Sequence, residues 1–174
     1  LMELGATVCA PQKPNCESCP AQRHCRGYNE LEKPEQLPVR LPKPPRPHHH
    51  LAVGLIWKGA KLLIDQRQEN ALLGGLWEFP GGEIGLHETP EAALRRGLRE
   101  ELAVEVEVQE FFMHLDHGFT HFSVTLHVYL CRHLAGRPRA IRCQKWRWAL
   151  LDELDRFAFP TAYRKIIHAL RQSF

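Results

Sequence analysis

Short runs of apolar residues, typical of strands, dominate the chain from residue 51 onward. Residues 51–57 and 61–66 are two such runs, and Lys58-Gly59 between them predicts a turn, so together they indicate a β-hairpin. Further strands are expected at residues 76–79, 104–108, 123–131 and 144–149, and a turn is expected at Pro80-Gly81-Gly82. The pattern therefore predicts a mixed sheet.

Two helices are predicted among these strands. Thr89-Pro90 is typical of a helix start, because threonine caps free N–H groups and proline fits the first helical position. This helix is expected to run to about Leu102, and a second one spans residues 161–172. Their buried faces are predicted from helical spacing as Ala92, Ala93, Leu94, Leu98 and Leu102, and as Tyr163, Ile166, Ile167 and Leu170. A mixed sheet flanked by helices belongs to the α+β class.

The composition divides the chain into three segments. Residues 1–26 hold four cysteines, residues 27–50 form a linker, and residues 51–174 form the folded domain. Prolines at 34, 38, 42, 44, 45 and 47 favour extended geometry, so we expect the linker to be a semi-rigid spacer. His48-His49-His50 follows it, but adjacent residues in a strand alternate between faces and seldom converge on one metal ion.

Charge and hydropathy exclude few functions. The net charge of +3 is modest and spread along the chain, so it names no partner. No apolar run approaches the roughly 18 residues of a membrane span, and the first residues lack the features of a signal peptide. We expect a cytoplasmic protein that is not secreted, associated with the nucleoid if bacterial.

The four cysteines near the start indicate a metal site. Cys9, Cys16, Cys19 and Cys25 place four soft thiolate donors within one short loop. By this chemistry alone a zinc ion and an iron–sulfur cluster fit equally well. The two remaining cysteines, Cys131 and Cys143, lie far away and are expected to be buried thiols.

Residues 81–104, GGEIGLHETPEAALRRGLREELAV, resemble the Nudix signature, which presents carboxylates to Mg²⁺ bound to a nucleotide diphosphate. Glu100 and Glu101 match its carboxylate end, but Gly97 stands where active hydrolases carry a glutamate. Ala103 replaces a glycine of the signature. Since glycine offers no metal ligand or base, we expect the scaffold without the hydrolysis.

The two glutamates have ordinary interpretations as well. Glu100 is expected to pair with Arg96 at helical i, i+4 spacing, and Glu101 to be solvated. The alternative is an active 8-oxo-dGTP diphosphatase, in which Glu100 and Glu101 hold Mg²⁺ and Glu88 or Glu83 replaces the missing carboxylate.

With the cysteine spacing, the segments LLGGLWEFPGGE, HGFTHF and FAFPTAYRKII resemble the C-terminal portion of MutY-family adenine DNA glycosylases over nearly the whole chain. The resemblance implies a [4Fe-4S] cluster on the four cysteines, with Lys13 in a loop that contacts DNA phosphates. It implies a Nudix-like domain that reads 8-oxoguanine through Phe119-Thr120-His121, where the family has Phe-Ser-His. The expected partner is double-stranded DNA with 8-oxoguanine opposite adenine.

The resemblance also places the catalytic carboxylates of the glycosylase upstream of this chain, so we expect no catalytic residue here. We expect a monomer whose linker is open to other repair proteins. Without the resemblance, Phe119 and Phe122 are ordinary core aromatics, and His114, His117 and His121 are surface or strand histidines.

Overall fold

The computed structural model describes residues 2–11, 13–37 and 46–173. The chain divides into two compact units, residues 1–45 and 46–174, each described by itself. No helix among the described residues is long and apolar enough to cross a membrane.

The first unit consists of short helical segments joined by loops. These are α1 (Met2–Thr7), the 3-10 turn η1 (Gln22–His24), α2 (Arg26–Glu30) and the 3-10 turn η2 (Pro34–Gln36). The described part of the expected spacer is therefore not uniformly extended, because α2 and η2 lie within it. An i, i+4 ion pair of 2.9 Å between Arg26 and Glu30 supports α2. Residues 38–45, with four of the linker prolines, lie outside the described residues.

The second unit is built on one mixed sheet. Its strands are β1 (His48–Lys58), β2 (Lys61–Gln66), β3 (Trp77–Glu78), β4 (Gly81–Glu83), β5 (Glu105–Gly118), β6 (Ser123–Ala135) and β7 (Lys145–Leu150). The order is β3-β2-β1-β6-β5, with β4 paired to β1 and β7 paired to β2. β1 and β6 are parallel, whereas the other pairs are antiparallel. The predicted α+β fold is confirmed.

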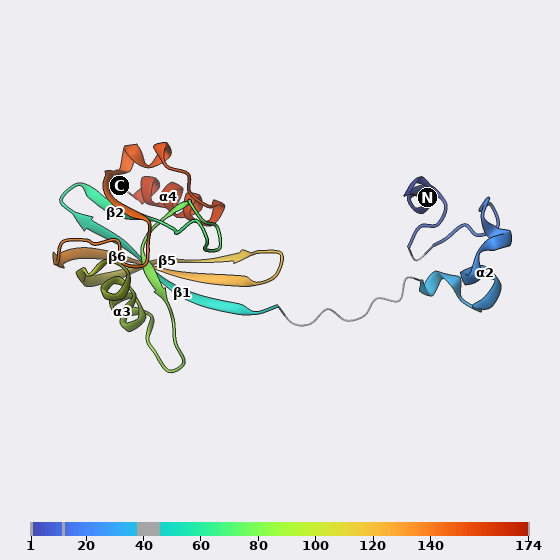
Figure 1. Ribbon diagram of the computed structural model, residues 1–174, viewed down its shortest axis with the longest axis horizontal. Coiled ribbons are helices and arrows are strands. Elements are labelled where there is room, and N and C mark those ends of the chain that lie inside the picture. The colour runs from blue at the N-terminus through green and yellow to red at the C-terminus, as the bar shows by residue number, and fades with distance from the viewer. Residues whose placement is uncertain (1, 12, 38–45, 174) are drawn as a thin grey trace. The chain divides into compact units, whose positions relative to one another are not determined.

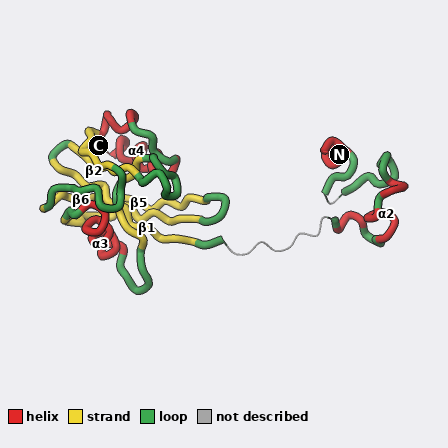
Figure 2. Tube along the Cα trace, viewed as in Figure 1, coloured by secondary structure: helices red, strands yellow, loops and turns green. Residues whose placement is uncertain are grey.

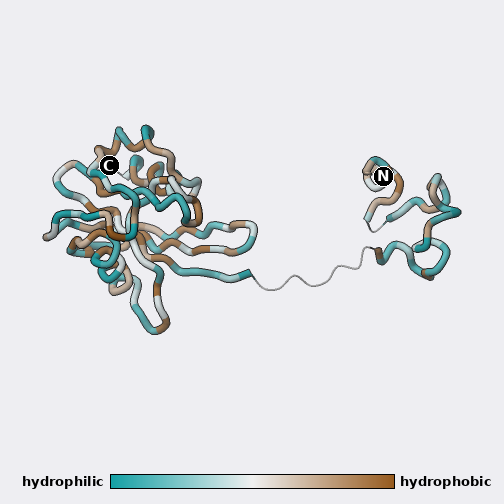
Figure 3. Tube along the Cα trace, in the orientation of Figure 1, coloured by the Kyte–Doolittle hydropathy of each residue, from teal (hydrophilic) through white to brown (hydrophobic). Residues whose placement is uncertain are grey.

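Helices cover both faces of this sheet (Figure 1). α3 (Pro90–Leu102) packs on one face, in a core with Ala52, Ile56 and Cys131. α4 (Thr161–Ser173) and the 3-10 turn η3 (Leu151–Arg156) pack on the other. Figure 3 shows the brown, hydrophobic segments gathered in the strands and helices of this region. Cys131 and Cys143 are buried, as expected, and burial raises the pKa of both thiols to about 12.

β4 corrects one expectation. Residues 80–82 were expected to form a turn, yet Gly81 and Gly82 pair with Val53 and Ala52 of β1. A Cβ atom on Gly81 would lie 2.0 Å from the Ala52 carbonyl oxygen, so the strand can lie this close only because the residue is glycine. The glycines that indicated a turn therefore serve close approach between strands.

α3 begins and ends as predicted but buries a slightly different face. The Ala92 N–H donates to the Thr89 side chain at 3.3 Å, which confirms the expected cap. Ala92, expected in the core, is exposed, and Gly97 is buried in its place. The predicted buried face of α4 is confirmed, and Ala162 joins it.

Ala103 ends α3 in a left-handed conformation, with φ of 55°. This conformation costs a residue with a Cβ atom about 1 kcal/mol. We therefore expect Ala103→Gly to raise the free energy of unfolding by about 1 kcal/mol, measured by urea denaturation. Ala92→Gly, at an exposed position in the first turn of the same helix, should lower it instead. The same sign for both changes would contradict this assignment.

β5 and β6 extend well beyond the expected strands. The predicted strand ended at residue 108; beyond it, Glu110, His114 and Asp116 interrupt the apolar pattern. In the structure β5 continues to Gly118, with register irregularities relative to β6. The hairpin thus ends in a short loop, residues 119–122, at the tip of two long strands (Figure 2).

Candidate functional site

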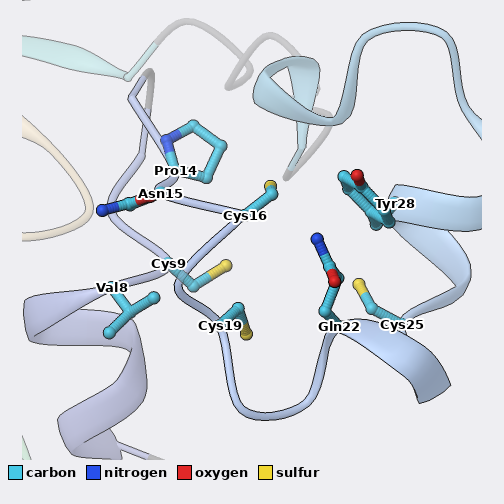
Figure 4. A pocket seen from close by; sticks show the side chains of 9 residues that line it. All are labelled: Val8, Cys9, Pro14, Asn15, Cys16, Cys19, Gln22, Cys25 and Tyr28. Atoms are coloured by element: carbon cyan, nitrogen blue, oxygen red, sulfur yellow. The ribbon is translucent and has the colours of Figure 1, made fainter.

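The four cysteines of the first unit surround one cavity. Cys9, Cys16, Cys19 and Cys25 line it together with Val8, Pro14, Asn15, Gln22 and Tyr28 (Figure 4). Desolvation and the neighbouring thiolates of Cys9, Cys25 and Cys19 raise the pKa of Cys16. No group of three or more Cys, His, Asp or Glu side chains among the described residues is arranged to hold a metal ion. The donor set nevertheless suits a thiolate-bound metal centre, since all four lie on one loop around one cavity.

Lys13 lies between Cys9 and Cys16 in the sequence, and it is exposed. It borders an open surface cavity with Cys16, Glu17 and Glu35. Its ammonium group is therefore accessible from solvent, and two carboxylates lie on the same surface.

The loop expected to read the lesion lies between β5 and β6 and presents its residues unequally. Thr120 and His121 are exposed at the tip. Phe119 is half-buried, stacked on Phe122 with ring centroids 4.5 Å apart, and His117 meets its edge at 4.7 Å. The Phe119 N–H donates to the Phe122 carbonyl at 2.8 Å, which closes the loop. The structure thus brings Thr120 and His121 to the surface and holds Phe119 against the core.

The Nudix-like segment forms the loop before α3 and the helix itself. Arg96 donates to both oxygens of Glu88, at 2.9 and 2.8 Å, and to the Glu83 carbonyl at 2.8 Å. These bonds from Arg96, with one from the Gly85 N–H, lower the pKa of Glu88 to about 2. Glu88 is therefore a fixed anion that shapes the loop.

Glu100 is held by two arginines. Arg96 lies 3.7 Å away, as expected from the helical spacing, and Arg142 lies 3.0 Å away. Glu100 is thus a partner of cations on the surface of α3.

At Gly97 the helix backbone lies directly against β4. A Cβ atom at this position would lie 2.2 Å from the Gly81 carbonyl oxygen and 2.8 Å from the Gly82 Cα. No side chain fits there unless the helix moves away from the strand. The missing carboxylate is therefore excluded by packing as well as by sequence.

Glu101 corrects another expectation, because it is not solvated. It lines a cavity of about 210 Å³ together with Arg67, Glu78 and Tyr163. Burial, reinforced by the Glu78 charge, raises the pKa of Glu101 to about 7. A carboxyl group in this state is half protonated near neutral pH.

Sequence reasoning missed the rest of this acidic cavity. Asp65 is buried, and desolvation together with Glu78 and Glu101 raises its pKa well above the ordinary value. Glu78 accepts a hydrogen bond from Arg67 and another of 3.2 Å from the Tyr163 hydroxyl. One Asp65 oxygen and the Arg67 Nε lack a hydrogen-bond partner. A lone aspartate within the apolar run 61–66 was the available signal.

The cavity brings together Arg67 and two carboxyl groups of raised pKa, Glu78 and Glu101. The buried Asp65 is paired with Glu78 across β2 and β3. Carboxyl oxygens are ligands that Mg²⁺ prefers. Because burial raises the pKa of both Glu78 and Glu101, metal binding here competes with their protonation.

Comparison with known proteins gives two kinds of relative. An adenine DNA glycosylase of Arabidopsis thaliana is 29% identical over 95% of this chain and 31% of its own length. An 8-oxo-dGTP diphosphatase of Escherichia coli (strain K12) is 32% identical over 70% of this chain and 95% of its own. The chain thus spans less than a third of the Arabidopsis glycosylase, but nearly the whole of the diphosphatase.

Solved structures and family models agree on the fold. The crystal structure of a MutT protein from Methanosarcina mazei Go1 covers 75% of this chain and 98% of its own, with a TM-score of 0.69 and 18% identity. The NUDIX domain model matches residues 52–169. The chain therefore belongs to the NUDIX domain family, and its similarity to adenine DNA glycosylases over nearly its whole length confirms the predicted resemblance to the C-terminal region of MutY-like proteins.

Proposed function

We propose that this chain is the part of an adenine DNA glycosylase that binds duplex DNA and reads 8-oxoguanine opposite adenine. The observation that carries the proposal is the β5–β6 hairpin, which presents Thr120 and His121 at an exposed tip. The similarity to adenine DNA glycosylases over 95% of the chain supports DNA as the partner.

At the lesion, a hydroxyl group is well suited to the altered purine edge, because it both donates and accepts a hydrogen bond. Thr120 offers such a group, and His121 beside it offers ring nitrogens to base or backbone. Phe119 is packed against Phe122, so its contribution is to hold the tip in place.

The four cysteines complete the proposal as ligands of a [4Fe-4S] cluster. Around one zinc ion the sulfurs must converge to about 2.3 Å from the metal, whereas a four-iron cluster accepts more widely spaced donors. The four cysteines line one cavity, and the similarity of the chain to adenine DNA glycosylases supports the iron–sulfur cluster over zinc. When bound, the cluster fixes the loop that carries Lys13, and Lys13 then makes a sequence-independent phosphate contact.

Thr120→Ala tests this function. We expect the preference of the chain for an 8-oxoguanine:adenine duplex over a guanine:adenine duplex to fall about fivefold, since one hydrogen bond is lost. Lys13→Ala should weaken binding to both duplexes alike and leave their ratio unchanged. Fluorescence anisotropy at fixed salt measures both. An unchanged ratio in Thr120→Ala would overturn the role of the tip.

The acidic cavity favours a second candidate function, that of an 8-oxo-dGTP diphosphatase, and the chain is similar to the E. coli enzyme of that name over 95% of the length of that enzyme. The packing at Gly97 argues against it. We expect no Mg²⁺-dependent hydrolysis of 8-oxo-dGTP by this chain. Turnover that disappears when Glu100 and Glu101 are both changed to Gln would establish the hydrolase instead. For the fragment alone we also expect no adenine release from a lesion duplex.

A further inference from the structure

The segment entering the second unit carries three histidines whose neighbours differ. His49 contacts Glu83 of β4 at 2.7 Å. His48 and His50 have ring centroids 4.7 Å apart, but only His48 bonds to the hydroxyl groups at the start of β6. Figure 3 shows this beginning of β1 as hydrophilic, in contrast to the hydrophobic strand that follows.

His48 forms the centre of a chain of hydrogen bonds between three strands. Its Nδ1 lies 2.7 Å from the Ser123 Oγ and its Nε2 lies 2.9 Å from the Thr125 Oγ1. The Thr125 hydroxyl in turn donates to Asp116 Oδ1 of β5. The base of the loop is thus connected across β1, β6 and β5.

The hydrogen-bond donors in this series of bonds determine the tautomer of His48. The only proton of the Thr125 hydroxyl goes to the Asp116 carboxylate, so Thr125 accepts from the His48 ring. His48 Nε2 must therefore carry a proton. In the neutral ring Nδ1 is then an acceptor, and Ser123 donates to it.

The same segment contacts both ends of the loop. The Ser123 N–H donates to the Pro47 carbonyl at 2.9 Å, where the loop ends. Arg46 donates to the Phe119 carbonyl at 3.4 Å, where the loop begins. Arg46 therefore contacts the first residue of the loop, while Pro47 and the His48 ring hold Ser123, the first residue after it.

We propose that His48, held as the Nε2–H tautomer by Asp116 through Thr125, is a positioning residue that orients the Thr120-His121 tip and so sets discrimination of the lesion. This inference rests on the proposed function of the loop. Its structural part, the fastening of Ser123 and Thr125 by the His48 ring, is measurable without DNA.

Three variants test the role. His48→Ala removes both side-chain bonds, and we expect amide exchange at Ser123 to accelerate about tenfold and lesion discrimination to fall about fivefold. His48→Gln keeps a terminal N–H donor for Thr125, so it should restore most of both. His50→Ala, two residues along the strand and bonded to His127 rather than to the loop, should leave both near wild type.

A spectroscopic signature distinguishes positioning from general loss of stability. Nitrogen NMR of the wild-type ring should show Nε2 protonated. Asp116→Asn can donate to Thr125, which frees the threonine proton for Nε2, and the Nδ1–H tautomer should then become detectable. A wild-type ring protonated only on Nδ1, or Ser123 exchange and lesion discrimination equal in His48→Ala and His50→Ala, would overturn the inference.

Failure of the proposed function has a different outcome. A wild-type chain that does not prefer the lesion duplex, although His48→Ala still accelerates Ser123 exchange, would overturn lesion reading while leaving the fastening of the loop by His48 intact.

Discussion

Gly97→Glu is expected to lower the free energy of unfolding by about 3 kcal/mol and to yield no hydrolysis of 8-oxo-dGTP. The substitution restores the carboxylate of the Nudix signature, but its first side-chain atom would lie 2.2 Å from the Gly81 carbonyl oxygen. That oxygen belongs to the backbone of β4, which is paired to β1 and cannot rotate away as a flexible side chain would. Urea denaturation and a phosphate-release assay with Mg²⁺ measure the two results.

Two alanine substitutions separate the clash from the charge. Gly97→Ala carries the same Cβ atom without the carboxylate and should lose most of the same stability. Gly118→Ala, whose added Cβ would meet nothing within 4 Å, should change the free energy of unfolding by less than about 0.5 kcal/mol. If Gly97→Ala were as stable as Gly118→Ala, α3 would not lie against β4 as closely as described. Efficient hydrolysis by Gly97→Glu would show that only the missing carboxylate prevents the reaction.

Glu101→Gln is expected to raise the free energy of unfolding by about 2 kcal/mol at pH 8 and to leave it unchanged near pH 4. Burial holds the pKa of Glu101 at about 7, against 4.5 when the group is free. Well below pH 4.5 the carboxyl group is protonated in both the folded and the unfolded state, so its ionisation does not change the free energy of unfolding. As the pH rises from 4.5 to 7 the unfolded chain ionises first, and the wild type loses stability relative to glutamine. The expected 2 kcal/mol is smaller than the free energy that corresponds to the whole difference between the folded and unfolded pKa values, because the Glu101 side chain keeps some contact with solvent.

Glu100→Gln is the matched comparison one residue earlier. Glu100 is paired with Arg96 and Arg142, so its loss should cost about 0.5 kcal/mol at pH 8. Thermal or urea unfolding of both variants across this pH range gives the two curves. Parallel curves for the two variants would mean that Glu101 is solvated, as the sequence alone had indicated.

The strands and helices that the sequence predicted well are those marked by the hydrophobic pattern of their side chains. Residues 61–66 became β2 with the predicted bounds, because the run is apolar and is bounded by a turn. α4 followed its helical spacing closely. β4 was missed because its glycines pair by close backbone approach, which no hydrophobic pattern records. For the same reason Gly97 is buried where Ala92 was expected to be, since the contact of α3 with β4 is between backbones.

The candidate sites differ in the same way: a site whose residues are close in the sequence could be predicted, and one assembled from distant elements could not. The cysteine loop is local in sequence, so its spacing alone predicts four donors around one centre. The acidic cavity joins Glu78 of β3 with Glu101 of α3, and the buried Asp65 is brought next to Glu78 by the pairing of β2 with β3. Such a site follows from strand register, which hydrophobic periodicity leaves open here. The length of β5 escaped for a third reason: in its outer half the partly buried Met113 and Leu115 alternate with the exposed His114 and Asp116, so no continuous apolar run marks it.

The parallel pairing of β1 with β6 has a mechanical consequence. It runs from His48 opposite Ser123 to Trp57 opposite Arg132, and β1 is the strand through which the chain enters the second unit. A force pulling back on that entry acts along the strand, so it loads the hydrogen bonds in shear and engages them together instead of peeling them one at a time. The attachment should therefore resist tension far better than a hairpin pulled from its open end.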